Sequence, residues 1–169
     1  MTSPIRVLDA RAADRWADAG ALIFEYMGAT QAELGLPVPA SVDELPARMR
    51  DECLDPGSVY RVPGVFLLAL HDDGPVGGVG LKPVPGTDAL KVSRLYARPD
   101  HRGGTGKLLM EHAHAYAARQ GFARLVLEVM PQRHQVIGLY RRLGYTEVKR
   151  EEQHRAFRML SMERLITPV

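Results

Sequence analysis

Residues 101–110, with the sequence His-Arg-Gly-Gly-Thr-Gly-Lys-Leu-Leu-Met, place three glycines among basic residues at the start of an amphipathic helix. Glycines let backbone N–H groups come close to an anion, because no side chain stands in the way. The first turn of the helix leaves further N–H groups unpaired, and the helix dipole adds partial positive charge at the same end. The stretch therefore predicts a turn that binds a phosphate group.

The spacing of the glycines argues against two of three common phosphate ligands. A mononucleotide P-loop needs a glycine where His101 stands and a Ser or Thr where Leu108 stands. A dinucleotide fingerprint that starts at Gly104 needs a small residue in place of Leu109 and belongs near an N-terminal strand. The pyrophosphate of coenzyme A remains as the favoured ligand.

Length and composition are those of an ordinary globular protein. The 169 residues predict one domain over positions 1–169, and the net charge of +2 argues against a nucleic-acid partner. The single cysteine, Cys53, allows no internal disulfide and no CxxC metal site, which fits a reducing cytoplasm. Because the start lacks a signal-peptide pattern and the longest apolar run, Val65–Leu70, is short, we expect a soluble cytoplasmic protein without membrane or metal.

The periodicity of apolar residues and the turn signals predict alternating strands and helices. A short strand includes Ile5 and Val7, and Ser41 with Glu44 forms a capping box. The predicted helices are Ala12–Tyr26, Ser41–Cys53, Thr105–Gln120 and Gln135–Leu143. The other predicted strands are Val65–His71, Val76–Val84, Ala89–Ala97, Arg124–Val129, Thr146–Lys149 and Phe157–Leu165, and the pattern of the last segment also fits a helix.

The third of these strands, Ala89–Ala97, carries a change of phase. Its apolar residues fall at Leu90 and Val92 and then at Leu95, which predicts a bulge near Ser93 and Arg94. The helix after the glycines then leads to another strand, and such a crossover predicts at least one parallel pair within a mixed sheet.

Three segments resemble the GNAT superfamily of N-acetyltransferases. They are Arg94-Leu95-Tyr96-Ala97-Arg98-Pro99-Asp100-His101-Arg102-Gly103-Gly104-Thr105-Gly106-Lys107-Leu108-Leu109, Leu125-Val126-Leu127-Glu128, and Ile137-Gly138-Leu139-Tyr140-Arg141-Arg142-Leu143-Gly144-Tyr145. The resemblance covers about residues 64–150. It implies a three-layer α/β (α+β) fold with a mixed, mostly antiparallel sheet, helices on both faces, and a V-shaped splay between strands 4 and 5.

The resemblance also implies acetyl-CoA as the cosubstrate. Its pyrophosphate would bind the N–H groups of Arg102 to Lys107, its pantetheine arm would pair with the backbone of Leu95–Ala97, and its thioester would lie beside Leu127–Val129. The implied cofactor-binding residues are Leu95, Tyr96, Ala97, His101, Arg102, Gly103, Gly104, Thr105, Gly106 and Lys107.

Three positions depart from the family pattern. His101 stands where the family has Gln or Arg, and Lys91 stands where related subfamilies carry a Glu. Arg133 replaces a frequent Asn, seven residues before Tyr140. The family motif makes Tyr140 the candidate acid that protonates the leaving thiolate, although its helical spacing from Val136 and Leu143 also fits a core residue.

The candidate base is Glu128, at the end of the strand beside the expected thioester. The alternatives are a salt-bridged or solvated carboxylate, and deprotonation through ordered water. Glu25, Tyr26, Tyr60 and Arg61 fall where the family shapes its acceptor pocket, without an assigned role.

These residues predict transfer of an acetyl group from acetyl-CoA to a primary amine, by direct attack in a ternary complex. The acceptor would be a small-molecule or peptide amine, and the enzyme a monomer or homodimer. Two alternatives remain: a non-catalytic acyl-CoA-binding sensor, which the residues Lys91 and Arg133 make possible, and a nucleotide-phosphate binder.

Overall fold

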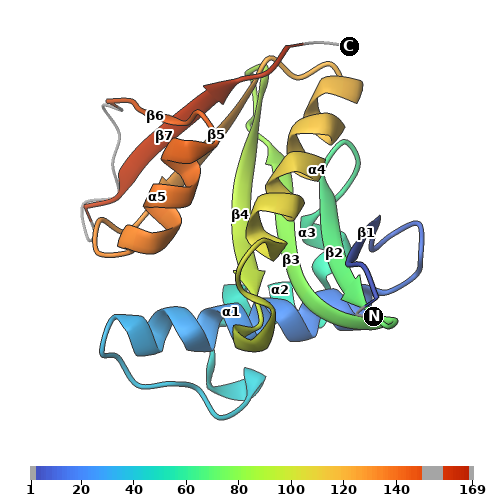
Figure 1. Ribbon diagram of the computed structural model, residues 1–169. Helices are drawn as coiled ribbons and strands as arrows, with labels where there is room; N and C mark the ends of the chain where they lie inside the picture. The colour runs from blue at the N-terminus through green and yellow to red at the C-terminus, as the bar shows by residue number, and fades with distance from the viewer. Residues whose placement is uncertain (1–2, 150–157, 168–169) are drawn as a thin grey trace.

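The computed structural model describes residues 3–149 and 158–167, within which seven strands form one sheet in the order β1-β2-β3-β4-β5-β7-β6 (Figure 1). The strands are β1 (Arg6–Asp9), β2 (Val65–His71), β3 (Gly74–Pro83), β4 (Ala89–Ala97), β5 (Arg124–Val129), β6 (Thr146–Glu147) and β7 (Leu160–Leu165). Only β4 and β5 are parallel neighbours among these strands. The predicted mixed, mostly antiparallel sheet is confirmed.

Helices cover both faces of the sheet, as predicted for a three-layer fold (Figure 1). The helices are α1 (Trp16–Glu33), α2 (Ala47–Leu54), α3 (Pro56–Val59), α4 (Thr105–Arg119) and α5 (His134–Arg142), with 3-10 turns at Val42–Glu44 and Pro99–His101. Strand β2 is buried on both sides because its side chains alternate: Phe66 and Leu68 pack with α1, whereas Leu67 and Ala69 pack in the core that contains α4 and α5.

The sheet opens between its two parallel strands. Strands β4 and β5 pair only through Ala89–Lys91, and beyond this point they diverge (Figure 1). The predicted bulge is confirmed on β4, because Ser93 faces Gly80 and Tyr96 faces Gly78, so that two residues of β4 oppose one of β3. The V-shaped splay implied by the family resemblance is therefore present.

Two N-terminal helices differ from the prediction. Helix α1 begins at Trp16 rather than Ala12, and it continues to Glu33 because Gly35, with φ of +68°, provides its C-terminal stop. The predicted second helix is divided, because Leu45 precedes a proline and is extended, so that α2 begins only after Pro46. The Ser41 hydroxyl makes no cap, whereas Glu44 accepts a hydrogen bond from the N–H of Ala40 at 2.7 Å.

The C-terminal part of the chain confirms two predicted strands with shorter bounds. Strand β6 covers Thr146–Glu147, and β7 begins at Leu160. The predicted start of the last strand, at Phe157, lies outside the described residues. Among the helices that the structure describes, none is long and apolar enough to cross a membrane.

Candidate active site

The glycine turn presents a row of free backbone donors at the start of α4. Gly103 and Gly104 have φ of +104° and +129°, which side chains rarely allow, so this path of the chain depends on glycine. The first helical bond runs from the N–H of Leu108 to the carbonyl of Gly104 at 2.9 Å. Within the described residues, the five N–H groups of residues 103–107 find no acceptor.

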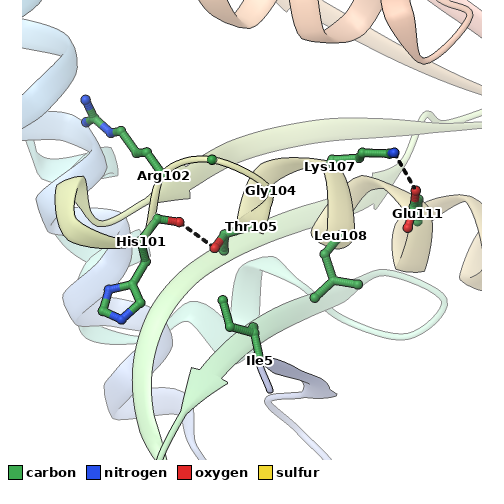
Figure 2. Close-up of a pocket in the computed structure, with 9 residues that line it drawn as sticks. Ile5, His101, Arg102, Gly104, Thr105, Lys107, Leu108 and Glu111 are labelled. Atoms are coloured by element: carbon green, nitrogen blue, oxygen red, sulfur yellow. Dashed lines mark hydrogen bonds and ion pairs between the residues drawn. The ribbon is translucent and has the colours of Figure 1, made fainter. Parts of the chain in front are cut away.

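The side chains of the turn are engaged elsewhere or lie in solvent (Figure 2). The Nε of Arg102 donates to the carbonyl of Ala97 at 3.3 Å, and Lys107 lies 3.9 Å from Glu111. The Thr105 hydroxyl donates to the carbonyl of His101 at 2.6 Å. Backbone N–H groups are therefore the main donors that the turn offers to an anion.

His101 points away from Arg102 in Figure 2. Its ring centroid lies 5.2 Å from that of His71, and its Nδ1 is buried without a partner among the described residues. A hollow of about 530 Å³ lies beside the turn, lined by Ile5, His101, Arg102, Gly103, Gly104, Thr105, Lys107, Leu108 and Glu111.

The splayed edge of β4 carries backbone groups that do not pair with β3, although the carbonyl of Ala97 accepts from the Nε of Arg102 at 3.3 Å. The N–H of Arg98 donates to the carbonyl of Val76 on β3 at 2.8 Å. Because successive residues of an antiparallel strand point their backbone groups to opposite sides, those of Ala97 face away from β3, towards the splay. By the same alternation, the backbone groups of Tyr96 point towards β3, where Tyr96 lies opposite Gly78.

A second cavity, of about 310 Å³, lies where β4 and β5 diverge. It is lined by Tyr26, Arg48, Met49, Glu52, Lys82, Lys91, Val92, Ser93, Arg94, Leu95, Glu128, Val129, Arg133, Tyr140 and Met159. Among the predicted residues it brings together Leu95, Glu128 and Tyr140, while the glycine turn lines the other hollow. We call this cavity the splay pocket.

Tyr140 is both a core residue and part of the wall of the splay pocket. Helix α5 has an apolar face on which Ile137 and Tyr140 are buried, and the Tyr140 ring packs at 5.6 Å from the ring of Tyr145. The hydroxyl makes no hydrogen bond within the described part of the chain. Burial raises the pKa of Tyr140 well above its usual range, with a smaller contribution from Tyr26, so the phenol stays protonated at neutral pH.

Glu128 lies at the pocket with a cation beside it. Its carboxylate is 3.5 Å from the Nζ of Lys91, across the point where β4 and β5 separate, and its side chain is 30% exposed. Lys91, which departs from the family pattern, is thus paired with Glu128, the candidate base. The carboxylate is both salt-bridged and at the edge of the pocket.

Sequence reasoning missed the buried carboxylate of Glu52 on α2. It accepts hydrogen bonds from the Nε and Nη2 of Arg94 at 2.8 and 3.1 Å, and from the Tyr60 hydroxyl at 3.2 Å. Glu52 is only 6% exposed. The signal available in the sequence was the bulge, because it predicted that Arg94 leaves the regular alternation of β4.

Two further lining residues, Tyr26 and Arg133, come from distant parts of the chain. Tyr26, one of four candidates for the acceptor side, lies beneath the guanidinium groups of Arg94 and Arg133, at 5.4 and 5.6 Å. Arg133 also pairs with Glu33 at 2.9 Å. Glu25, by contrast, pairs with Arg98 and does not line the splay pocket.

Residues 32–145 match the model of the acetyltransferase (GNAT) family. This match agrees with three features of the structure, namely the splayed parallel pair, the glycine turn at the start of a helix and the tyrosine beside the splay. The chain belongs to this family. Over 98 residues it is 31% identical to an uncharacterized N-acetyltransferase of Schizosaccharomyces pombe, covering 56% of this chain and 60% of that protein. The chain thus spans less than two thirds of this curated relative.

Solved structures share the fold over nearly the whole chain. A GNAT acetyltransferase of Staphylococcus aureus gives a TM-score of 0.75 at 14% identity, covering 97% of this chain and all of that one. The PaiA N-acetyltransferase of Thermoplasma acidophilum, solved with coenzyme A, gives 0.67 at 16% identity, with coverage of 96% and 99%. The ribosomal-protein-S18-alanine N-acetyltransferase of Escherichia coli gives 0.67 at 18%, with coverage of 98% and 96%.

Proposed function

We propose that this protein transfers the acetyl group of acetyl-CoA to a primary amine by direct attack in a ternary complex. The observation that carries the proposal is that Tyr140 and Glu128 line one pocket, at the point where the edge of β4 becomes free of β5. Family membership supports the use of an acyl-CoA. The acetyl specificity and the amine acceptor are our inference from this pocket.

Binding of the coenzyme rests on two sets of backbone groups. The N–H groups of residues 103–107 form a concave set of donors that suits the pyrophosphate, and the dipole of α4 reinforces them. The backbone of Leu95 and the N–H of Ala97 are suited to the amides of the pantetheine arm, as an added strand would be. Tyr96 contributes through its place in β4 rather than through its own backbone donors.

Two proton transfers accompany the reaction. The acceptor amine, with a reference pKa near 10.4, must lose a proton before it attacks the thioester carbon. The carbon–sulfur bond then breaks, and the thiolate, with a reference pKa near 8.5, takes a proton. We assign this second proton to Tyr140, which lines the pocket and is protonated at neutral pH, and the first to Glu128, either directly or through water.

The experiment is a thiol-release assay with acetyl-CoA and a panel of primary amines, with a thermal-shift measurement in acetyl-CoA alone alongside it. We expect acetyl-CoA to raise the melting temperature and at least one amine to release stoichiometric coenzyme A together with its N-acetyl product. Absence of both effects would overturn the proposal.

A non-catalytic acyl-CoA sensor is a second candidate, favoured by one contact. The candidate base Glu128 is engaged in an ion pair with Lys91 at 3.5 Å rather than facing the pocket alone. A sensor would bind acetyl-CoA tightly and release no coenzyme A with any amine. The Lys91→Met variant distinguishes the two, since an enzyme restrained by this pair keeps measurable transfer whereas a sensor shows none in either form.

A further inference from the structure

The splay pocket carries an excess of positive charge. Of the described residues that line it, five are cationic, namely Arg48, Lys82, Lys91, Arg94 and Arg133, and two are carboxylates, Glu52 and Glu128. The excess of three charges exceeds the net charge of +2 of the entire chain. The lining of this one cavity therefore carries a larger net positive charge than the chain as a whole.

Three of the five cations have carboxylate partners. Arg94 pairs with Glu52, Lys91 with Glu128, and Arg133 with Glu33 from outside the pocket. Within residues 3–149 and 158–167, no carboxylate lies within ion-pair distance of Lys82 or Arg48. These two cations come from β3 and α2, so they face the cavity from two elements.

Lys82 is the more constrained of these two cations. Its side chain is half-buried, and its Nζ lies 5.9 Å from the centre of the Tyr60 ring. Burial lowers its pKa, Glu52 opposes this shift, and Lys91, Arg94 and Arg48 lower the pKa further. Several like charges therefore act on one lysine, and an anion between them would offset the repulsion and the desolvation penalty.

The coenzyme cannot supply this anion. If acetyl-CoA binds as proposed above, its phosphates lie at the glycine turn, and the end that reaches the splay pocket is an uncharged thioester. The negative charge must then come from the other substrate. We propose that the acceptor is a small molecule with an anionic group, a carboxylate or phosphate, which Lys82 and Arg48 bind while its amine faces Tyr140 and Glu128.

The size of the pocket agrees with a small acceptor. A volume of about 310 Å³ is at the lower end of the range for small-molecule sites. This inference rests on the proposed acetyl transfer and narrows its substrate class. It also suggests how the acceptor is oriented, because the unpaired cations belong to β3 and α2, whereas the candidate acid belongs to α5.

The test compares small primary amines of different charge, among which glycine and glycinamide are nearly the same size. The carboxylate arm uses glycine, β-alanine and 4-aminobutyrate, the phosphate arm uses O-phosphoethanolamine, and the uncharged and cationic arms use propylamine, glycinamide and putrescine. We expect kcat/KM for the best anionic amine to exceed that of every uncharged or cationic amine by about tenfold or more, as for one charged contact. A higher kcat/KM in the carboxylate arm would identify the anionic group as a carboxylate, and a higher kcat/KM in the phosphate arm would identify it as a phosphate.

Variants locate the anion site. The ratio of interest is kcat/KM for the best anionic amine divided by kcat/KM for the best uncharged amine. Lys82→Met and Arg48→Met should each reduce this ratio to within about threefold of unity, while leaving KM for acetyl-CoA unchanged. Arg50→Met is the matched control, because Arg50 belongs to α2 but does not line the pocket, and it should keep the wild-type ratio. Equal kcat/KM across the charge classes, or a preference for putrescine, would overturn this inference and leave the acetyl transfer intact.

A measurement without turnover covers the case in which no amine is acetylated. The amine-free anions 4-hydroxybutyrate and glycolate 2-phosphate should raise the melting temperature of the wild-type protein with coenzyme A, and Lys82→Met should remove this rise. A rise without transfer would support the anion site and overturn the proposed enzyme. No rise in the wild type would overturn the anion site.

Discussion

The buried carboxylate of Glu52 accepts two hydrogen bonds from Arg94, at 2.8 and 3.1 Å, although the two residues are far apart in sequence and lie on α2 and β4. Arg94 has φ of +57°, an uncommon conformation for a residue other than glycine. The β4 bulge produces this conformation and turns the guanidinium towards α2. A local irregularity of the strand thus connects the N-terminal helices to the wall of the splay pocket.

Replacing Glu52 by glutamine should destabilise the fold. The variant leaves the guanidinium of Arg94 largely buried without its counter-charge, which costs about 3 kcal/mol in the free energy of unfolding. Urea denaturation measures the loss. Asp51→Asn, on the exposed face of the same helix, is the control and should change the free energy by less than about 0.5 kcal/mol. A loss below about 1 kcal/mol for Glu52→Gln would contradict the importance of this ion pair.

Gly104→Ala should weaken coenzyme binding. A side chain at φ of +129° strains the turn, and relief of that strain moves the N–H groups of residues 103–107 out of their arrangement. We expect Kd for coenzyme A, measured by calorimetry, to rise about tenfold. Gly28→Ala is the control, since the added methyl group meets only an ordinary contact with Val38. An unchanged Kd would mean that the turn does not hold the pyrophosphate.

The regular part of the fold could be predicted because its signals are local. Strands β2, β4 and β5 have the bounds that the apolar patterns indicated, and Gly121 and Gly144 end their helices in the left-handed conformation. The end of α1 was misplaced although Gly35 carries the same signal. The divided second helix shows that a proline overrides a capping-box pattern.

The site was harder to predict than the fold, because its contacts join distant segments. A glutamate within a helical pattern indicates a solvated face, and nothing in the pattern of α2 shows that Glu52 meets Arg94. The pair of Lys91 with Glu128 depends on the register of the parallel strands, which local spacing does not determine. The family resemblance predicted Tyr140, whereas its helical spacing alone indicated a core residue.

His114 makes stability depend on pH. Its Nδ1 accepts from Arg164, so the neutral ring carries its proton on Nε2, which lies 3.0 Å from the Tyr145 hydroxyl. Burial, and to a smaller extent Arg164, lowers the pKa of His114 from 6.5 to about 4. Between these values the unfolded chain binds the proton and the folded chain does not, so stability falls as pH falls from 6.5 to 4.

Melting temperatures measured from pH 7.5 to 4.5 test this dependence. His114→Gln should have a smaller decrease over this range than the wild type. His112→Gln, two residues away and exposed on the same helix, should keep the wild-type decrease. Parallel curves for the wild type and His114→Gln would rule out His114 as the source.

Glu128→Gln tests the base. If Glu128 takes the amine proton, the acidic limb of the pH profile of kcat/KM should disappear and kcat should fall by about 10². Glu147→Gln, on the exposed strand β6, should leave the profile unchanged. An intact profile in Glu128→Gln would assign the deprotonation to ordered water.

The central claim is that Tyr140 protonates the thiolate of coenzyme A during acetyl transfer in the splay pocket. Its most direct test is kcat for thiol release by Tyr140→Phe, with Tyr116→Phe as control, since the Tyr116 hydroxyl donates to the carbonyl of Pro63 and lies outside that pocket. We predict that kcat of Tyr140→Phe falls by about 10² to 10³ while KM for acetyl-CoA stays within about twofold. An unchanged kcat would contradict the assignment.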